Sequence, residues 1–397
     1  MQRIGIYGGT FNPPHWGHIR AAQHACEALA LDCLLMIPDR IAPHKQLPEG
    51  SPEPEQRLEM LRLGTAQMDK IQVSDIELKR EGPSYTYITV EQIRKAYPDA
   101  KLYLLMGTDM FLSFHTWREP QRILKEVSLA VLYRGDKGEK EAIDQRMAAM
   151  ELHGADVELV ENPVTAISST QLRRMLVFGC AGQFLPEPVL EYIHRHDLYA
   201  AASCYRNLSE EALTETVVRL LDPKRVKHVL GCREAAVELA RRHGANETDA
   251  ARAALLHDIT KALDGPLQLT LCREYGIVLD IFSRQNPRTL HALTGSLVAE
   301  RVFGENEAVV SAIRSHTTGK ANMDLLEKII YVADYMEPNR DFPGVERLRE
   351  LAYADIDGAL KLGLEMTLDM LKRQGREISP ESVEALAYLT KSCVQKG

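Results

Sequence analysis

The sequence has little of what marks a membrane, disulfide-rich or nucleic-acid-binding protein. Its 397 residues contain no apolar run long enough to cross a bilayer, and its seven cysteines are odd in number and form no Cys-x-x-Cys pair. Asp and Glu (56) outnumber Lys and Arg (48), which gives a formal net charge of -8 at pH 7. These shortages argue against a disulfide framework, a membrane-spanning segment and bulk positive charge for nucleic acid. They predict a cytoplasmic protein without nucleic-acid or membrane partners.

The length and the pattern of the chain predict two domains. A chain of 397 residues is too long for one typical hydrophobic core, and its 45% hydrophobic content is ordinary for a globular protein. Apolar runs alternate with helical patterns until about residue 199, and nearly everything after residue 207 has the pattern of a helix. We therefore expect one domain at residues 1–201 and a second at residues 207–397, without a long Gly/Ser linker. The first residues run directly into an apolar segment, so no signal peptide is expected.

The first half has the alternation of strands and helices that is typical of a parallel sheet covered on both faces. The predicted strands are 4–7, 33–38, 71–78, 101–106, 129–133 and 157–161. The helical patterns between them include 55–67, 86–96 and 110–126. The second half predicts helices alone, among them one that begins at Asp222-Pro223, one at 235–242 and one that begins at Glu247. The expected fold class is an α/β doubly wound parallel sheet (Rossmann-like) followed by an all-α domain.

A glycine-rich turn follows the first predicted strand and precedes the first predicted helix. Its sequence is Gly8-Gly9-Thr10-Phe11-Asn12-Pro13-Pro14-His15-Trp16-Gly17-His18. Glycines let the backbone approach a phosphate, and the helix presents free N–H groups and the positive end of its dipole. His15 and His18 add side-chain donors on one turn. An ordinary first turn with two surface histidines is the alternative, but the combination of residues favours a triphosphate site.

A second phosphate-binding pattern lies at residues 167–173, Ile-Ser-Ser-Thr-Gln-Leu-Arg. The hydroxyl residues Ser168–Thr170 open a predicted helix that also carries Arg173. One hydroxyl would be enough for an ordinary N-cap, whereas three hydroxyls and an arginine make an anion cradle. The turn Gly107–Asp109 also follows a predicted strand. Ligands of parallel sheets bind beyond the carboxyl ends of the strands, so we expect this turn and the Gly8 turn to face one crevice.

These patterns resemble the nucleotidylyltransferase superfamily, and residues 1 to about 199 resemble its nicotinate-nucleotide adenylyltransferase branch. The resemblance implies transfer of AMP from ATP to nicotinate mononucleotide, which gives deamido-NAD and pyrophosphate, with Mg²⁺ on the phosphates. It gives His15, His18 and Arg173 the catalytic role of stabilising the additional negative charge. It assigns ATP binding to residues of three turns, Gly8, Gly9, Thr10, Phe11, Gly107, Asp109, Ser168, Ser169 and Thr170. It assigns the mononucleotide to His44, Lys45, Tyr85, Thr86 and Trp117.

Parts of this assignment have alternatives. Trp117 is either a pyridine-binding ring or an ordinary aromatic of the hydrophobic core. Lys45 is either a ligand of the mononucleotide phosphate or a solvated surface lysine. Pantetheine-phosphate adenylyltransferase is a rival activity in the same superfamily. That family is shorter and usually has Thr-x-Gly-His, whereas His15 stands at the first of these positions here. Trp117 together with Tyr85-Thr86 favours a pyridine substrate.

The second half carries histidines and carboxylates within apolar helical patterns. His228, the adjacent pair His257-Asp258 and Asp334 each lie in such a pattern. A His-Asp pair alone is a weak signal, but a buried carboxylate is costly unless it meets a cation or strong hydrogen bonds. Two imidazoles and two carboxylates suit a divalent transition metal such as iron or manganese. The sequence therefore predicts a metal site formed by these residues.

The order of these residues resembles the HD superfamily of metal-dependent phosphohydrolases. Residues 255–261, 315–319 and 332–340 further resemble the HD-type symmetrical bis(5′-nucleosyl)-tetraphosphatases, over about residues 213–395. The resemblance implies hydrolysis of diadenosine tetraphosphate to two ADP at an iron-type centre. It assigns the grip on the substrate phosphates to Arg225, Lys261, His291, His316, Thr317 and Arg340. Asn339 stands where the family pattern would have glycine.

Two alternatives stay open for this half. One hypothesis is that this half is a non-catalytic nucleotide sensor that regulates the first half. The other is that it hydrolyses another nucleotide, such as guanosine tetraphosphate. The complete ligand set argues against the sensor. The sequence leaves open whether the chain forms a homo-oligomer and whether the two sites communicate.

Overall fold

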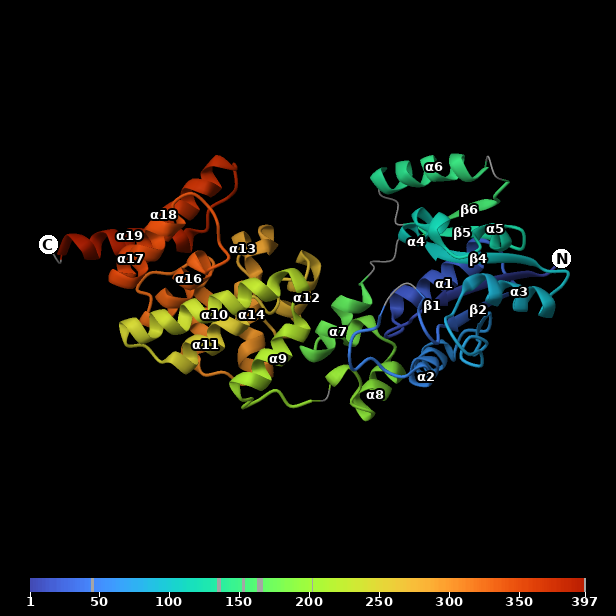
Figure 1. The fold of residues 1–397 in the computed structure, drawn as a ribbon, viewed down its shortest axis with the longest axis horizontal. Coiled ribbons are helices and arrows are strands. Elements are labelled where there is room, and N and C mark those ends of the chain that lie inside the picture. The colour runs from blue at the N-terminus through green and yellow to red at the C-terminus, as the bar shows by residue number, and fades with distance from the viewer. Residues whose placement is uncertain (44–45, 134–136, 152–153, 163–166, 202, 396–397) are drawn as a thin grey trace. The chain divides into compact units, whose positions relative to one another are not determined.

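The computed structural model describes the chain except for residues 44–45, 134–136, 152–153, 163–166, 202 and 396–397 (Figure 1). Its backbone contacts divide into two compact units, Met1–Ser203 and Cys204–Gly397. The first unit contains the sheet, and the second is built from helices. Among the described residues, no helix combines the length and the apolar composition that a bilayer crossing needs.

The first unit is built on a six-stranded sheet of order β3-β2-β1-β4-β5-β6, and every pairing is parallel. The strands are β1 (Arg3–Gly9), β2 (Cys33–Pro38), β3 (Ile71–Val73), β4 (Lys101–Gly107), β5 (Ser128–Tyr133) and β6 (Val157–Glu161). The inner strands are continuous apolar runs because helices cover both of their faces. This confirms the predicted doubly wound α/β fold.

Two apolar cores lie against the sheet, one on each face. The helices of this unit are α1 (Trp16–Ala28), α2 (Pro54–Thr65), α3 (Thr86–Ala96), α4 (Thr108–Leu112), α5 (Pro120–Leu124), α6 (Lys137–Glu151), α7 (Ser169–Val177) and α8 (Glu187–Arg195), with 3-10 turns at Phe114–Thr116, Gly182–Phe184 and Leu198–Ala200. One core joins buried residues of α1 and α2 to strand side chains such as Leu34 and Leu105. The other joins α3, α4, α5 and α6 to strand side chains such as Ile4 and Leu104.

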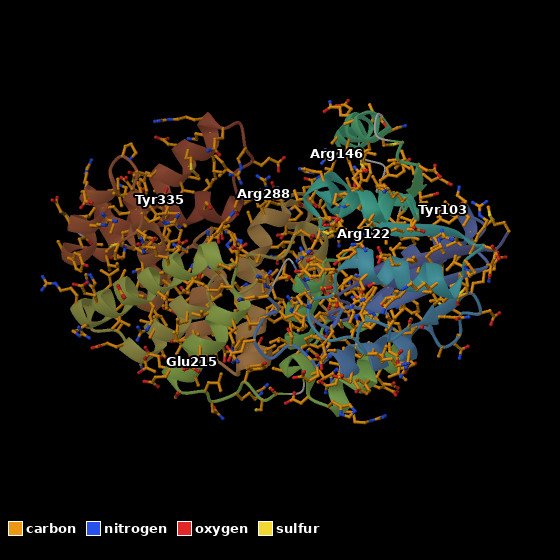
Figure 2. All side chains as sticks on the ribbon, turned by 45° about the vertical axis from the view of Figure 1, so that its right-hand side comes forward. Tyr103, Arg122, Arg146, Glu215, Arg288 and Tyr335 are labelled. Carbon is orange, nitrogen blue, oxygen red and sulfur yellow. The ribbon has the colours of Figure 1, made fainter. Side chains whose placement is uncertain are left out.

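Charged side chains close the amino-terminal edge of the sheet. Tyr103 of β4, labelled in Figure 2, is fully buried, and the cations of Arg3 and Lys101 lie 5.0 and 4.9 Å from its ring centroid. Arg3 and Lys101 begin β1 and β4. The carboxyl ends of the same two strands are the edge at which ligands of such sheets bind.

Two predicted elements of this unit were wrong. The strand predicted at 71–78 ends at Val73, because turns that begin at Asp75 follow it, with Leu78 N and Lys79 N donating to Asp75 O. The helix predicted at 110–126 is broken into α4, a 3-10 turn at Phe114–Thr116 and α5. The residue before Pro120 is Glu119, which has φ 54°, and a proline disfavours helical backbone in the residue before it.

The second unit consists of helices. They are α9 (Glu210–Leu220), α10 (Pro223–His243), α11 (Glu247–Leu256), α12 (Gly265–Glu274), α13 (Ile281–Gln285), α14 (Leu290–Val298), α15 (Glu307–Ser315), α16 (Leu325–Met336), α17 (Val345–Ala354), α18 (Ile356–Arg373) and α19 (Pro380–Gln395), with a 3-10 turn at Pro287–Thr289 and a π-helical turn at Ala299–Phe303. This confirms the predicted helical region. The Asp222 side chain caps α10 by accepting from Lys224 N at 2.9 Å.

The helix predicted at 235–242 is wrong as a separate element, because α10 runs without interruption through Gly231 to His243. Gly231 costs helix propensity, but it sits where α10 approaches the segment after α16 too closely for a side chain. A Cβ there would lie 2.4 Å from Glu337 Oε2. The glycine is therefore explained by packing.

Candidate functional sites

The glycine-rich turn lies at the carboxyl end of β1, beside the carboxyl end of β4. Ile6 of β1 pairs with Leu104 of β4, and β2 pairs with the other edge of β1. The chain therefore winds to opposite sides from β1, which is the arrangement that opens a ligand crevice. Gly8-Gly9 and Gly107 end these two neighbouring strands, so both predicted turns lie at the same edge of the sheet.

His15 caps the first helix and is fixed in one tautomer. Its Nδ1 accepts from Gly17 N at 3.1 Å at the start of α1, so the proton of a neutral ring must lie on Nε2. His15 is 4% exposed, and this burial lowers its pKa to about 4. The ring of His18 lies 3.8 Å away, centroid to centroid. His15 thus offers a neutral N–H donor at pH 7.

Arg173 joins the two phosphate-binding patterns. Its Nη1 donates to Asn12 O at 2.8 Å, across 161 residues of sequence, and its Nη2 donates to Thr170 Oγ1 at 3.0 Å. Ser168 is the N-cap of α7 and accepts from Gln171 N at 3.2 Å. One of the three hydroxyls is therefore used as an ordinary cap. Arg173 therefore joins the hydroxyl of Thr170 to the first turn.

Arg57 and Asp39 hold the glycine-rich turn, although the sequence pattern did not single them out. Arg57 is fully buried and donates from Nη1 to Thr10 O at 2.6 Å and to Asp39 Oδ1 at 3.0 Å. Its Nη2 donates to Asp39 O at 2.7 Å, and Thr10 Oγ1 donates to Asp39 Oδ2 at 2.8 Å. Arg57 belongs to α2 and Asp39 follows β2, so no local pattern could have shown that they meet.

The predicted mononucleotide residues lie near the start of α3 and after α4. Tyr85 is the N-cap residue of α3, and its hydroxyl oxygen accepts from Arg118 Nη1 at 3.1 Å. Trp117 is half-buried against the core, with its ring 5.2 Å from that of Phe114. His44 and Lys45 lie outside the described residues. Asp109 is exposed in the first turn of α4.

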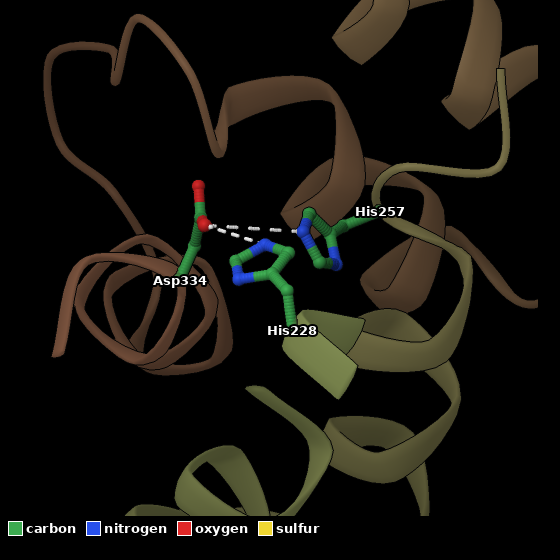
Figure 3. Close-up of side chains that lie close together, drawn as sticks. All are labelled: His228, His257 and Asp334. Carbon is green, nitrogen blue, oxygen red and sulfur yellow. Dashed lines mark ion pairs between the residues drawn. The ribbon is translucent and has the colours of Figure 1, made fainter. Parts of the chain in front are cut away.

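The predicted metal ligands of the second unit lie close together. His228 Nε2 is 3.1 Å from Asp334 Oδ1 and 3.7 Å from Asp258 Oδ2, and His257 Nε2 is 3.5 Å from the same Asp258 oxygen. Figure 3 shows the imidazoles of His228, on α10, and of His257, just after α11, both facing Asp334. The position of one pair differs from the prediction. His257-Asp258 lies just after the end of α11 and not within a helix.

His291 and His316, predicted to bind substrate phosphates, lie on the other oxygen of Asp258. Their Nε2 atoms are 3.5 and 3.8 Å from Asp258 Oδ1 and 3.2 Å from each other. Thr317 Oγ1 is 3.0 Å from His291 Nε2. Asp258 therefore stands between two pairs of imidazoles, which face its two oxygens.

Backbone carbonyls orient three of these imidazoles toward the centre. The Nδ1 atoms of His257, His291 and His316 donate to the carbonyls of Ala254, Arg288 and Ile313, at 2.7, 2.9 and 2.6 Å (Arg288 is labelled in Figure 2). Each lone pair is thereby left on Nε2. Burial lowers the pKa of all three rings, that of His316 to about 4, so they are neutral at pH 7. Neutral imidazoles held in this way are good metal ligands.

The donor set fits a divalent transition metal. Ligand atoms of His228, His257 and Asp334 lie within 4.8 Å of one another, and so do those of His257, Asp258 and His316. His257 Nε2 is buried and makes no hydrogen bond within the described part of the chain. Such an orphaned lone pair is costly in a protein interior unless something binds it. Nitrogen and carboxylate ligands together favour iron, manganese or a similar ion.

Cationic side chains surround these carboxylates. Arg225 forms an ion pair with Asp258, and Arg340 Nη2 donates to Asp334 Oδ1 at 2.7 Å. Burial would raise the pKa of Asp334, but the neighbouring His228 and the charge of Arg340 bring it well below its usual range. Lys261 Nζ is 2.8 Å from His291 Nε2, and burial lowers the pKa of this lysine to about 8. These cations are the groups predicted to meet substrate phosphates.

Comparisons with known proteins match the two halves separately. A cytidylyltransferase-like family model matches residues 6–175, and an HD domain model matches residues 225–339. A probable nicotinate-nucleotide adenylyltransferase of Exiguobacterium sibiricum is 35% identical over 199 residues, which are 50% of this chain and 99% of the relative. One of Shewanella baltica is 38% identical over 215 residues, again 50% of this chain and 99% of the relative.

A solved structure resembles the second half. It is described as a predicted HD superfamily hydrolase involved in NAD metabolism from Clostridium acetobutylicum. It has 38% sequence identity, covers 47% of this chain and 98% of its own chain, and has a TM-score of 0.46. By the two family models, the chain carries an N-terminal cytidylyltransferase-like domain and a C-terminal HD domain.

Proposed function

Through its N-terminal half, this chain belongs to the nicotinate-nucleotide adenylyltransferase family, and on that premise we propose that this half transfers AMP from ATP to nicotinate mononucleotide. The products are deamido-NAD and pyrophosphate. The observation that carries the proposal is Arg173, which joins the Gly8 turn, at Asn12 O, to Thr170 at the start of α7. Two phosphate-binding segments brought together at the sheet's carboxyl edge suit a triphosphate.

The reaction needs positioning and charge stabilisation and no covalent enzyme intermediate. An oxygen of the mononucleotide phosphate attacks the α-phosphorus of ATP, and pyrophosphate leaves. His15, with its proton on Nε2, His18 and Arg173 stabilise the additional negative charge. Arg57 and Asp39 keep the turn in shape. Mg²⁺ neutralises phosphate oxygens when it is bound.

ATP lies along the Gly8 turn, with Asp109 at the adenosine and the residues Ser168–Thr170 at the phosphates. Nicotinate mononucleotide lies toward Tyr85, Thr86 and Trp117. The first turn of α3, which begins at Thr86, is half-buried, and the N–H groups at a helix start pair with the carboxylate of nicotinate better than with an amide.

We further propose that the HD half is a metal-dependent hydrolase of dinucleoside tetraphosphates. His228, His257, Asp258 and Asp334 hold a divalent iron or manganese ion, which activates water and polarises phosphoryl oxygens when bound. The support is the set of neutral imidazoles whose Nε2 atoms face the carboxylates. His291 and His316 lie near the other oxygen of Asp258, so two further imidazoles are available to bind a second cation there.

The cations around the carboxylates suit a polyphosphate substrate. Arg225, Lys261, Arg340 and the hydroxyl of Thr317 lie at the edge of the ligand cluster, where they bind phosphate oxygens as their present partners take up metal. A regulatory nucleotide sensor is the second candidate for this half. A sensor does not need stoichiometric metal, so metal content separates the two.

One set of assays tests both proposals. Purified chain is given ATP and Mg²⁺ with either nicotinate or nicotinamide mononucleotide, and separately diadenosine tetraphosphate with Fe²⁺ or Mn²⁺, and the products are separated by chromatography. We expect deamido-NAD and pyrophosphate from the first mixture and ADP alone from the second. Failure to form any dinucleotide contradicts the first proposal. Intact tetraphosphate in the presence of bound metal contradicts the second and favours another nucleotide substrate, whereas a chain that holds no stoichiometric metal favours the sensor.

A further inference from the structure

Glu337 is a buried carboxylate whose environment differs from that of comparable residues in the second unit. Its side chain is 2% exposed and follows the end of α16 directly. Glu327, 1% exposed on the same helix, has Lys320 Nζ at 2.6 Å, and Glu305 has Arg252 Nη2 at 2.6 Å. Among the described residues, no lysine or arginine side chain forms an ion pair with Glu337. Something other than general charge pairing therefore explains a carboxylate at this place.

The partners of Glu337 point to its role. Its Oε1 lies 3.2 Å from His228 Nδ1, and its Oε2 accepts from Asn339 N at 2.7 Å and from Asn339 Nδ2 at 2.8 Å. Both oxygens are thus occupied, one by the imidazole and one by the asparagine. The other nitrogen of the same imidazole, Nε2, faces Asp334.

His228 needs a side-chain partner because of where it stands. His257 and His316 directly follow the ends of α11 and α15, and His291 is at the start of α14, so each reaches a backbone carbonyl three residues earlier. His228 lies inside α10, where the carbonyls bind the helix's own N–H groups. A histidine in mid-helix has no free carbonyl within reach to fix its Nδ1.

We propose that Glu337 is a positioning residue for the metal site. It accepts the Nδ1 proton of His228, fixes the Nε2 lone pair and turns the ring toward Asp334 and Asp258. This inference rests on the proposed metal-binding function of these residues. Groups that hold a metal-ligating imidazole in this way typically change metal affinity by ten- to a hundredfold when they are removed.

The surroundings of Glu337 are shaped to keep it in place. Gly231 is one turn after His228 on α10, and a Cβ there would lie 2.4 Å from Glu337 Oε2 and 2.7 Å from Asn339 Nδ2. Asn339 Nδ2 also donates to Lys227 O at 3.1 Å, and Arg349 Nη2 donates to Glu337 O at 2.9 Å. Asn339, where glycine was expected, thus supplies a second donor that ties the carboxylate to α10.

Mn²⁺ binding to the metal-free chain tests the proposal. The full chain is stripped of metal with a chelator, and its Mn²⁺ affinity is measured by calorimetric titration for wild type, Glu337→Ala and the control Glu327→Gln. We expect the affinity to fall by about ten- to a hundredfold in Glu337→Ala. The Mn²⁺ affinity of the control should stay within about twofold of the wild-type value, because Glu327 is equally buried but contacts none of the proposed ligands. Gly231→Ala, which leaves every ligand intact, should weaken Mn²⁺ binding in the same direction because it displaces Glu337.

A second measurement does not depend on metal. Nitrogen NMR of the histidine side chains in the metal-free chain should show His228 Nδ1 protonated in wild type and a loss of that Nδ1 proton in Glu337→Ala, where Asp334 still faces Nε2. Unchanged Mn²⁺ affinity and an unchanged tautomer in folded Glu337→Ala would overturn the inference. A wild-type chain that binds no Mn²⁺, yet shows the tautomer change, would contradict the proposed metal function and leave the orienting contact established. Adenylyl transfer, measured alongside, reports that the other unit is intact.

Discussion

Replacing His15 with asparagine should make the N-terminal unit less sensitive to acid. Burial lowers the pKa of His15 from 6.5 to about 4. As the pH falls below about 6.5, His15 takes up a proton in the unfolded chain but not in the folded chain. The contribution to stability is therefore fully present above pH 6.5 and is lost as the pH falls toward about 4.

The two pKa values set the size of the effect. At pH 5 the histidine is about 97% protonated in the unfolded chain and about 9% in the folded one. Integrated from pH 7 to pH 5, this difference lowers the free energy of unfolding by about 2 kcal/mol. Asparagine has no proton to gain and is a good N-cap residue, so it should keep the contact with Gly17 N.

Tryptophan fluorescence makes the assay specific to one unit. Both tryptophans of the chain, Trp16 and Trp117, lie in the first unit, so fluorescence during urea unfolding reports this unit alone. Wild type and His15→Asn are unfolded at pH 7 and pH 5, with His194→Asn as a control at an exposed histidine of α8. We expect the loss between the two pH values to be about 2 kcal/mol smaller in His15→Asn alone. Equal losses in all three proteins would refute a buried, neutral His15.

Three further predictions concern activity. His18→Ala should lower the rate of adenylyl transfer by about a hundredfold or more, because a preorganised hydrogen-bond donor is lost, and should leave tetraphosphate hydrolysis unchanged. A folded variant with the wild-type rate of transfer would contradict the role of His18. Nicotinate mononucleotide should have a higher kcat/KM than the nicotinamide form, since a hydrogen bond to a charged group contributes about 1.5–3 kcal/mol, and equal or reversed values would defeat this assignment. Asp334→Ala should lose bound metal and hydrolase activity together while adenylyl transfer continues, and metal analysis that finds full occupancy would remove Asp334 from the ligand set.

The sequence predicted best what depends on neighbouring residues. Continuous apolar runs gave the inner strands, and the glycines after them gave the turn at residues 8–18, because both signals are complete within a few residues. The break between α4 and α5 was missed, although Pro120 is a local signal for it. The continuity of α10 through Gly231 could not be seen, because a glycine in a helix is explained here only by the approach of Glu337.

Contacts between segments that are distant in the sequence could not be predicted from it. Arg57 looked like any helical arginine, and its burial against Thr10 and Asp39 depends on how α2 packs beside the first two strands. His291 is predicted to bind substrate phosphates from its place in the sequence, and its short distance to Asp258 follows from the packing of α14 beside the segment after α11. Such residues become visible as functional candidates only when the fold is known.

The two units use the same side chain in opposite ways, and the difference lies in a single hydrogen bond. In the first unit Nδ1 of His15 accepts from a backbone N–H, so its proton lies on Nε2 and the ring is a hydrogen-bond donor. In the second unit Nδ1 of His257 donates to a backbone carbonyl, so the lone pair lies on Nε2 and the ring accepts. Burial lowers the pKa of both rings and keeps them neutral. A neutral donor suits an anionic substrate and a neutral acceptor suits a metal ion, so the backbone group that meets Nδ1 decides which chemistry each histidine supports.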